Sequence, residues 1–294
     1  MFKAGYVAII GRPNVGKSTL VNQVLGQKVV IATPKPQTTR RRIKGIFTNE
    51  EAQIIFFDTP GVTKPLDKLG EFLLDESKCS IPDADVILFV VDVTDKAGKG
   101  DKWIAKNLLD TKIPIILVLN KVDLIKNPLK KEENLLSYKT LFQENLPTVK
   151  ISAKTGRNID TLIKNIIRKL PEGEPIYAED EVTDESMRNI AKEIIREKIL
   201  LHTNDELPHS VAIVIDEYKE TEEIDNILAS VYVETESQKG IMIGKGASML
   251  KKISTDTRIE LEDIAQKKIY LNIQVKVQKK WRQNQKKVKD WIGS

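Results

Sequence analysis

The stretch that decides the fold is Gly11-Arg12-Pro13-Asn14-Val15-Gly16-Lys17-Ser18, which matches the phosphate-loop pattern G-x-x-x-x-G-K-S/T at every fixed position. An apolar run at 6–10 precedes it and predicts a buried strand. Residues 18–25 follow with apolar side chains at helical spacing. The backbone N–H groups of such a loop, together with the helix dipole, attract a β-phosphate. Strand, glycine loop and helix N-terminus therefore occur in the order that phosphate binding needs.

Within this loop, Lys17 is expected to bridge the β- and γ-phosphates, and the Ser18 hydroxyl is expected to bind Mg²⁺. A glycine turn that binds nothing is the alternative, which the flanking strand and helix disfavour. The residues expected to surround the phosphates are Gly11, Arg12, Pro13, Asn14, Val15, Gly16, Lys17, Ser18 and Thr19.

Length and composition indicate a folded protein of about two domains. The chain has 294 residues, of which 40% are hydrophobic and 30% charged. Its single cysteine, Cys79, excludes an internal disulfide and fits a reducing compartment. No apolar run is long enough to span a bilayer, and the first residues lack the pattern of a signal peptide. We therefore expect a cytoplasmic protein.

Positive charge is concentrated at the C-terminal end. The formal net charge is +5, but residues 239–294 alone hold 14 Lys and Arg against five Asp and Glu. The rest of the chain is therefore net acidic. A basic piece on an acidic body indicates a polyanionic partner. A solvated lysine-rich surface is the alternative that charge alone leaves open.

A second motif, Asp58-Thr59-Pro60-Gly61, follows two short strands predicted at 43–47 and 53–57. The stretch 27–42 before them has no sustained period, and we expect a mobile loop there. Behind a phosphate loop, Asp58 is expected to hold Mg²⁺ through water, and the Gly61 N–H is expected to meet the γ-phosphate.

A third motif, Asn120-Lys121-Val122-Asp123, identifies the base. The Asp123 carboxylate can accept from both N1–H and the 2-amino group of guanine, and adenine offers neither donor. We expect the Lys121 stem to cover the purine face and Asn120 to join this loop to the phosphate loop. In a fourth motif, Ser152-Ala153-Lys154, the Ala153 N–H can donate to guanine O6.

Four motifs in this order indicate a guanine-nucleotide site. Outside the phosphate loop, its expected members are Asp58, Thr59, Pro60, Gly61, Asn120, Lys121, Asp123, Ser152, Ala153 and Lys154.

Strands and helices alternate along the first part of the chain. Further strands are predicted at 86–92, 114–119 and 148–151, and helices at 99–109, 130–142 and 158–170. This alternation predicts an α/β domain at 1–171 with a mostly parallel sheet and helices on both faces. Open sheets of this kind bind ligands at the C-terminal ends of their strands, which is where the motifs lie.

The motifs resemble those of the translation-factor-related GTPases that assist ribosome assembly and RNA modification. The resemblance implies that Mg²⁺ is held by Ser18, Asp58 and Thr39, with Thr38 as the alternative to Thr39. Val62 stands where Ras-type GTPases have a water-orienting glutamine, so we expect slow hydrolysis of GTP to GDP.

Asn14 resembles the asparagine that helps several of these relatives to hold K⁺ against the phosphates. Such a cation would stabilise charge in the transition state. An ordinary hydrogen bond within the loop is the alternative role for this side chain. The residues expected to act on the γ-phosphate are therefore Lys17, Asn14 and Gly61.

An acidic segment ends the first domain. Residues 172–185 hold seven acidic side chains, few of which could be buried. We expect a linker there and a second domain at 186–294. Its predicted elements are a helix at 187–201, strands at 211–215 and 227–233, a glycine loop at 240–247, a helix to about 265, a strand at 269–277 and a basic helix at 279–292.

This order resembles a type II KH domain, a small α+β module in which a G-x-x-G loop clamps the backbone of unpaired nucleotides. Gly244 matches the opening glycine, but the closing position is Ala247, with Gly246 one place early. A domain that binds only proteins is the alternative. The RNA-binding residues expected from the resemblance are Ile243, Gly244, Lys245, Gly246, Ala247, Lys251, Lys252, Lys276, Lys280 and Trp281.

Taken over nearly its whole length, the chain resembles the bacterial ribosome-assembly GTPases that join these two domains. The resemblance implies a monomeric GTP-dependent switch that binds 16S ribosomal RNA near its 3′ end and acts on the 30S subunit. It also implies peripheral contact with the inner membrane. A guanine-nucleotide-dependent protein or membrane adaptor whose KH-like domain binds no RNA is the alternative function.

Overall fold

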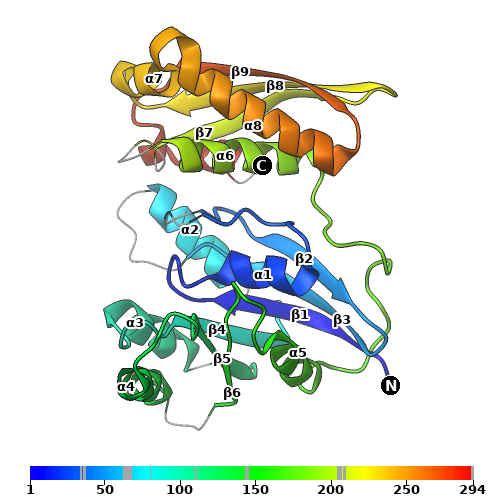
Figure 1. The fold of residues 1–294 in the computed structure, drawn as a ribbon, viewed down its shortest axis with the longest axis vertical. Coiled ribbons are helices and arrows are strands. Elements are labelled where there is room, and N and C mark those ends of the chain that lie inside the picture. The colour runs from blue at the N-terminus through cyan, green and yellow to red at the C-terminus, as the bar shows by residue number, and fades with distance from the viewer. Residues whose placement is uncertain are drawn as a thin grey trace. The chain divides into compact units, whose positions relative to one another are not determined.

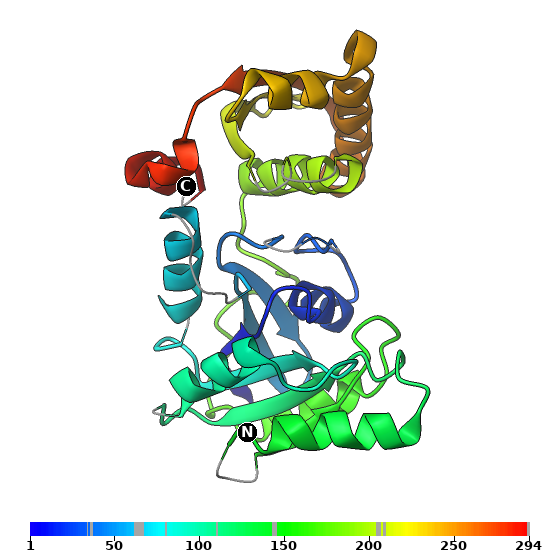
Figure 2. The same ribbon diagram turned by 90° about the vertical axis from the view of Figure 1, so that its left-hand side faces the viewer.

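The computed structural model describes residues 1–33, 35, 38–61, 68–79, 81–109, 111–142, 146–203, 207 and 210–292. The chain divides into two compact units, Met1–Lys64 with Leu73–Asp184 and Pro65–Phe72 with Glu185–Ser294. Each unit contains its own sheet, as Figures 1 and 2 show. Each sheet also has its own hydrophobic core.

The first sheet has six strands in the order β2-β3-β1-β4-β5-β6, and every neighbouring pair is parallel except β2 with β3. Its strands are β1 (Lys3–Ile10), β2 (Ile43–Thr48), β3 (Ala52–Asp58), β4 (Val86–Asp92), β5 (Ile115–Asn120) and β6 (Thr148–Lys150). The helices before residue 185 are α1 (Lys17–Leu25), α2 (Lys68–Cys79), α3 (Lys99–Leu108), α4 (Pro128–Lys139) and α5 (Ile159–Ile167). The first residues of α2 belong to the second unit. The predicted mostly parallel α/β sheet is confirmed.

Helices cover both faces of this sheet (Figure 1). Successive strand residues point to opposite faces, so Val7 and Ile9 of β1 pack in one core cluster with α1 and α5. Ala8 and Ile10 pack in the other cluster with α3 and α4. Because both faces are covered, β3 and β5 are buried along their whole length, as the apolar runs at 54–57 and 115–119 predict.

Helix α2 was not predicted from the sequence, which placed no element between the second motif and β4. Its signal is the pair Leu69 and Leu73, which are spaced four residues apart and both buried. Polar residues dominate the rest of the helix, and its weak apolar pattern explains the omission.

The acidic segment predicted as a linker lies along the first sheet. Gln53 of β3 is fully buried, and its side-chain oxygen accepts hydrogen bonds from the backbone N–H groups of Ile176 and Tyr177, at 2.6 and 2.8 Å. The Gln53 amide nitrogen donates to the Tyr177 carbonyl at 2.9 Å. The Ile46 N–H of edge strand β2 donates to the Val182 carbonyl at 2.9 Å. The bond to Val182 pairs a backbone group of the edge strand β2, and the bonds of Gln53 satisfy its buried side-chain amide.

The second unit has a three-stranded sheet in the order β7-β8-β9, antiparallel between β7 and β8 and parallel between β8 and β9. Helices α6 and α8 contribute to the core over this sheet. Its elements are α6 (Met187–His202), β7 (Ala212–Lys219), β8 (Ile224–Val233), α7 (Glu236–Ile243), α8 (Ser248–Ala265), β9 (Lys268–Val277) and α9 (Gln285–Ile292). The predicted small α+β domain is confirmed.

Two predictions for this unit are wrong in extent. The glycine loop was expected at 240–247, but 236–243 is helical, because Thr235 and Gln238 form a capping box that starts α7. The basic helix was expected at 279–292, but α9 begins only at Gln285. A short 3₁₀ turn, Trp281–Gln283, precedes it and follows Lys280, whose φ of 53° breaks the helix.

Among the helices in the described ranges, none is both long enough and apolar enough to cross a bilayer.

Candidate functional site

The phosphate loop connects β1 to the N-terminus of α1 and depends on two glycines. A Cβ on Gly11 would lie 2.3 Å from the carbonyl oxygen of Val90 on β4. A Cβ on Gly16 would lie 2.4 Å from the Asn120 side-chain nitrogen, and Gly16 also has a φ of 96°. The loop can therefore follow this path only with glycine at both positions. Its path brings the first N–H groups of α1 to the mouth of the loop, where an anion is favoured.

Lys17 begins α1 and is buried at 6% exposure. Its ammonium donates to the carbonyl oxygens of Gly11 and Arg12, both at 3.1 Å. Burial lowers the pKa of Lys17 to about 8, although the nearby Asp58 carboxylate opposes the shift. A phosphate beside this ammonium would favour its charged form, so nucleotide binding and protonation of Lys17 are coupled.

Three oxygen-bearing side chains from three separate segments converge next to Lys17. The Ser18 hydroxyl donates to Asp58 Oδ2 at 2.7 Å, and the Thr39 hydroxyl donates to the same oxygen at 3.0 Å. Ser18 Oγ and Thr39 Oγ1 are also 3.0 Å apart. Two hydroxyls and a carboxylate are the hard oxygen donors that Mg²⁺ prefers, so these residues fit the ion.

Thr38 has different partners. Its hydroxyl donates to the Lys35 carbonyl at 2.6 Å and lies 2.7 Å from the Thr33 hydroxyl. Of the two threonines left open by the sequence, Thr39 is therefore the one placed beside Ser18 and Asp58.

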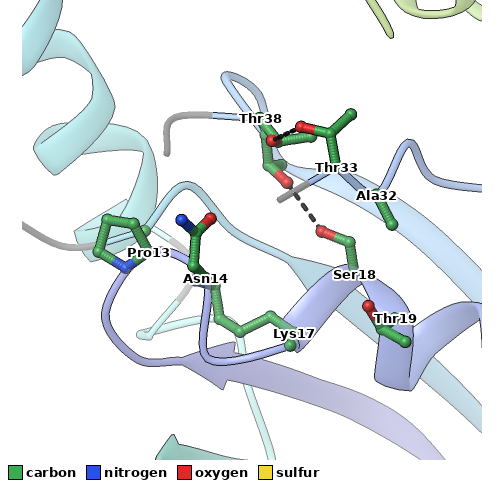
Figure 3. Close-up of a pocket in the computed structure, with 11 residues that line it drawn as sticks. Pro13, Asn14, Lys17, Ser18, Thr19, Ala32, Thr33 and Thr38 are labelled. Atoms are coloured by element: carbon green, nitrogen blue, oxygen red, sulfur yellow. Dashed lines mark hydrogen bonds between the residues drawn. The ribbon is translucent and has the colours of Figure 1, made fainter. Parts of the chain in front are cut away.

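Residues that sequence reasoning missed complete this cavity. Ala32 and Thr33 line it together with Pro13, Asn14 and the start of α1. Figure 3 shows the segment that carries Ala32, Thr33 and Thr38 facing the phosphate loop. The two residues lie in a stretch without periodicity, so no pattern in the sequence identified them.

The Asp58-Thr59-Pro60-Gly61 motif is packed tightly onto the phosphate loop. The Thr59 hydroxyl donates to the Ile9 carbonyl of β1 at 2.6 Å. A Cβ on Gly61 would lie 2.6 Å from both the Cα and the backbone nitrogen of Pro13. Glycine is therefore needed for this close approach, which brings the Gly61 backbone to the lining of the cavity. Val62, where the sequence lacks a water-orienting glutamine, lies outside the described residues.

The base loop is joined to the phosphate loop through Asn120, at the end of β5. Its side-chain nitrogen donates to the Val15 carbonyl at 2.8 Å, and its side-chain oxygen accepts from the Ala153 N–H at 2.9 Å. The Lys121 ammonium donates to the Asn14 carbonyl at 2.7 Å. Asp123 is exposed and has no such structural partner among the hydrogen bonds of this loop, which suits a side chain that recognises a ligand. Ser152 and Lys154 flank Ala153.

Arg12 has a structural partner that the sequence did not indicate. Its guanidinium forms an ion pair with Asp101 at 2.8 Å, and the Asp101 carboxylate is fully buried and also accepts from the Gly98 N–H at 2.9 Å. Burial lowers the pKa of Arg12, but the Asp101 carboxylate outweighs it and raises the pKa overall. The pair fixes the beginning of the phosphate loop to the start of α3.

The glycine loop of the second unit lies between α7 and α8. Gly244 has a φ of 73°, Gly246 a φ of 57° and Ala247 a φ of 59°. Ala247 therefore adopts a left-handed backbone, at a cost of about 1–2 kcal/mol for a residue with a Cβ. Ile243 is partly exposed at the end of α7.

The lysines expected to bind RNA are exposed. They are Lys245, Lys251, Lys252, Lys276 and Lys280. The first three lie in the glycine loop or in the first turns of α8. The Lys276 ammonium is 5.9 Å from the centre of the Tyr232 ring on β8.

Trp281, expected to contact RNA, is instead a core residue. It is fully buried, and its indole N–H donates to the Ser210 carbonyl at 2.9 Å. Its ring packs 5.9 Å from that of Trp291. Since the ring has no exposed face and its one donor is used, the expectation of an RNA contact by Trp281 is corrected.

The two parts of the chain match two different family models. Residues 6–121 match the family model for the 50S ribosome-binding GTPase, and residues 206–282 match the KH domain. The protein named GTPase Era of Nostoc sp. is 50% identical over 96% of this chain and 86% of its own length. GTPase Era of Carboxydothermus hydrogenoformans is 46% identical over 96% of this chain and 94% of its own length.

Two solved structures match the whole chain at 41% identity, covering 99% of both chains. One is a variant of Aquifex aeolicus Era bound to GDP and AlF4⁻, with a TM-score of 0.94. The other is Era in complex with MgGDPNP and nucleotides 1506–1542 of 16S ribosomal RNA, with a TM-score of 0.95.

The position of Thr39 beside Ser18 and Asp58 predicts that loss of the Thr39 hydroxyl, but not of the Thr38 hydroxyl, weakens Mg²⁺ binding. Thr39→Ala removes one of three converging oxygens, so the Mg²⁺ concentration needed for half-maximal GTP hydrolysis should rise about tenfold. Thr38→Ala should change it little, since that hydroxyl bonds within its own loop. The measurement is a Mg²⁺ titration of hydrolysis for both variants, and the reverse order would make Thr38 the ligand.

The lowered pKa of Lys17 predicts a pH-dependent affinity for GDP. Because the bound form needs the ammonium, raising the pH from 7 to 9 through a pKa of about 8 should weaken GDP binding about tenfold. Lys17→Arg should show a flatter profile, because arginine stays charged in this range. Calorimetric titrations at several pH values check this, and parallel profiles for the two proteins would contradict it.

The exposed Asp123 predicts a switch of base preference. Asp123→Asn exchanges one acceptor for a donor, so GDP affinity should fall at least about tenfold and binding of xanthosine diphosphate should improve. Competition between the two nucleotides measures the change. A variant that still prefers GDP would show that another residue recognises the base.

Proposed function

Since the chain belongs to the Era family of GTPases, we propose that it uses GTP binding and hydrolysis to control its attachment to small-subunit ribosomal RNA near the 3′ end. In this role it assists assembly of the 30S subunit. The observation that carries the proposal is one chain with two sites: a complete guanine-nucleotide site and a basic glycine loop of KH type. The relative solved with nucleotides 1506–1542 of 16S ribosomal RNA supports the choice of RNA.

In the first site, the chain's own groups surround the triphosphate. The N–H groups of the phosphate loop and the Lys17 ammonium bind the β- and γ-phosphates. Ser18, Thr39 and Asp58 hold Mg²⁺, which neutralises developing charge on the phosphate oxygens. The Gly61 N–H contacts the γ-phosphate. When that phosphate leaves, the segments that carry Thr39 and Gly61 both lose a partner and can relax.

Hydrolysis is slow because no glutamine follows Gly61 to orient water. Asn14 lies at the lining of the phosphate cavity, with its backbone carbonyl held by Lys121. We propose that its side-chain oxygen helps to hold K⁺ beside the phosphates. A cation there would supply the stabilisation that an arginine finger supplies in other GTPases.

In the second site, Lys245, Lys251 and Lys252 place three exposed positive charges on and beside the glycine loop. Such charges bind phosphates of an RNA backbone, and the loop between α7 and α8 clamps unpaired nucleotides. The surplus of Lys and Arg from residue 239 onwards extends this positive surface.

A second function rests on Ala247. Its Cβ is exposed at the position where a KH loop normally has glycine, so it can press against an approaching backbone. If that contact prevents RNA binding, the chain is a guanine-nucleotide-dependent adaptor for a protein or a membrane. The family and the positive charge favour RNA.

We further propose that the protein acts as a monomer in the bacterial cytoplasm, with peripheral contact to the inner membrane. The single cysteine supports a reducing compartment such as the cytoplasm, and the family supports the membrane contact.

The proposed cation predicts a dependence on the monovalent salt. Replacing Na⁺ with K⁺ should raise the hydrolysis rate of the wild type several-fold and change Asn14→Ala little, because the variant lacks the oxygen that holds the ion. Steady-state release of phosphate in matched salts measures this. Equal wild-type rates in both salts would exclude the cation while leaving the GTPase assignment intact.

The proposed switch predicts that RNA binds the GTP form more tightly than the GDP form. By linkage, RNA must then tighten GTP binding by the same factor. The measurement is filter binding of a single-stranded RNA from the 3′ end of 16S RNA, at one fixed salt concentration, with GDP and with a non-hydrolysable GTP analogue. Identical affinities would mean that nucleotide and RNA bind independently.

A pair of charge reversals tests where the RNA binds. Lys251→Glu with Lys252→Glu should abolish RNA binding and leave GDP affinity unchanged. Lys102→Glu with Lys106→Glu on α3 makes the same change of charge at two exposed sites and is the matched control. RNA binding that survives the first pair would move the RNA site elsewhere, and no binding by the wild type would favour the adaptor.

A further inference from the structure

Asp92 ends β4, at the same edge of the sheet as the nucleotide motifs, and belongs to none of them. It lies opposite Asn120 in the register of β4 with β5. It is therefore one strand away from the base loop and close to the phosphate loop. Nothing in the sequence pattern distinguishes it from an ordinary polar residue at a strand end.

The carboxylate of Asp92 is held at both oxygens. Oδ2 accepts from the Lys121 ammonium at 2.6 Å. Oδ1 accepts from the backbone N–H of Thr94 at 3.0 Å and from its hydroxyl at 2.7 Å. The Tyr138 hydroxyl fixes the Asp92 backbone carbonyl at 2.8 Å. Burial raises the pKa of Asp92, but the bonds from Lys121 and Thr94 outweigh it and hold the pKa below its usual value.

Lys121 is the residue on which Asp92 acts. Its φ of 65° is left-handed, which costs about 1–2 kcal/mol for a residue with a Cβ. Such strain persists only where surrounding contacts impose it. On the backbone, the Leu124 N–H donates to the Lys121 carbonyl at 3.1 Å and the Val122 N–H donates to the Ile151 carbonyl at 3.2 Å. The ammonium adds two bonds, to Asp92 and to the Asn14 carbonyl at 2.7 Å. With both ends of the side chain fixed, the direction of its hydrocarbon stem is fixed as well.

We propose that Asp92 is a positioning residue for guanine-nucleotide binding: it holds the Lys121 ammonium on the phosphate loop, so that the stem is in place to cover the purine. Asp92 and Thr94 thereby form a support that keeps the base loop and the phosphate loop together before the nucleotide arrives. The proposal rests on the assignment of the base to Asn120–Asp123.

A double-mutant cycle on the full-length chain tests this support. Asp92→Asn keeps the size of the side chain but removes its charge and one acceptor, and it should weaken GDP binding about tenfold. Lys121→Ala should weaken it further. In the Lys121→Ala background, Asp92→Asn should have no additional effect, because its partner is already gone. Calorimetric titration with GDP measures all four proteins.

Two controls accompany the cycle. Asp95→Asn removes the same charge from an exposed position of the same loop and should leave GDP affinity unchanged. Thr94→Val removes one bond to the carboxylate and should cause a smaller loss than Asp92→Asn, again absent in the Lys121→Ala background. It provides the same test if Asp92→Asn fails to fold.

Base preference separates this proposal from the site assignment. The ratio of GDP to xanthosine-diphosphate affinity should be unchanged in Asp92→Asn and reversed in Asp123→Asn. An equal loss from Asp92→Asn with and without Lys121 would overturn the positioning role alone, since it would reflect a general structural effect. Unchanged GDP affinity in Asp92→Asn would do the same. An unaltered preference in Asp123→Asn would overturn the base assignment and the proposal with it.

Discussion

The two hydrogen bonds of the Asn120 side chain are the contact on which the nucleotide site depends. One goes to the Val15 carbonyl in the phosphate loop and the other comes from the Ala153 N–H in the loop after β6. Three segments that are far apart in the chain therefore share one buried amide. The approach is so close that Gly16 has no space for a side chain. A nucleotide site binds the phosphates in one loop and the base in another, so the two loops must be held at a fixed distance from each other.

The same edge of the sheet carries the three side chains that we propose as Mg²⁺ ligands. Ser18, Thr39 and Asp58 come from α1, from the segment before β2 and from β3, and all meet at one carboxylate oxygen. Strand β2 starts only four residues after Thr39 and is also the strand on which the acidic segment lies. The acidic segment is thus hydrogen-bonded to the strand that follows Thr39. Thr39 is therefore connected to that segment by a short stretch of backbone and the hydrogen bond from Ile46 to Val182.

The second unit keeps a KH-type loop with an unusual closing residue. Gly244, Gly246 and Ala247 all have a positive φ, so the shape of the loop depends on two glycines and on neighbours that impose the same kind of backbone on Ala247. Directly before the loop, α7 is started by the Thr235 and Gln238 capping box and not by any apolar pattern. Trp281 contributes to the core, and its indole N–H donates a hydrogen bond to the Ser210 carbonyl. The positive surface at the glycine loop therefore consists of exposed lysines, and the residues beneath them form the core of the second unit.

The order of the motifs along the chain, the mostly parallel α/β class and the KH-like second domain all follow from the amino-acid sequence alone. The prediction that the Asp123 carboxylate recognises guanine rests on the sequence as well. These features depend on local patterns: fixed glycine spacings, unbroken apolar strands and residues at strand ends. Only the tertiary structure decided that Thr39 rather than Thr38 meets Ser18 and Asp58, and that Trp281 is buried. Only it showed that the acidic segment lies on β2 and β3, held by Gln53. Asp92 and Asp101 also acquire their partners solely through folding. The physical reason is that hydrogen bonds between residues tens of positions apart leave no periodic trace in a sequence, because each depends on where two separate elements come together.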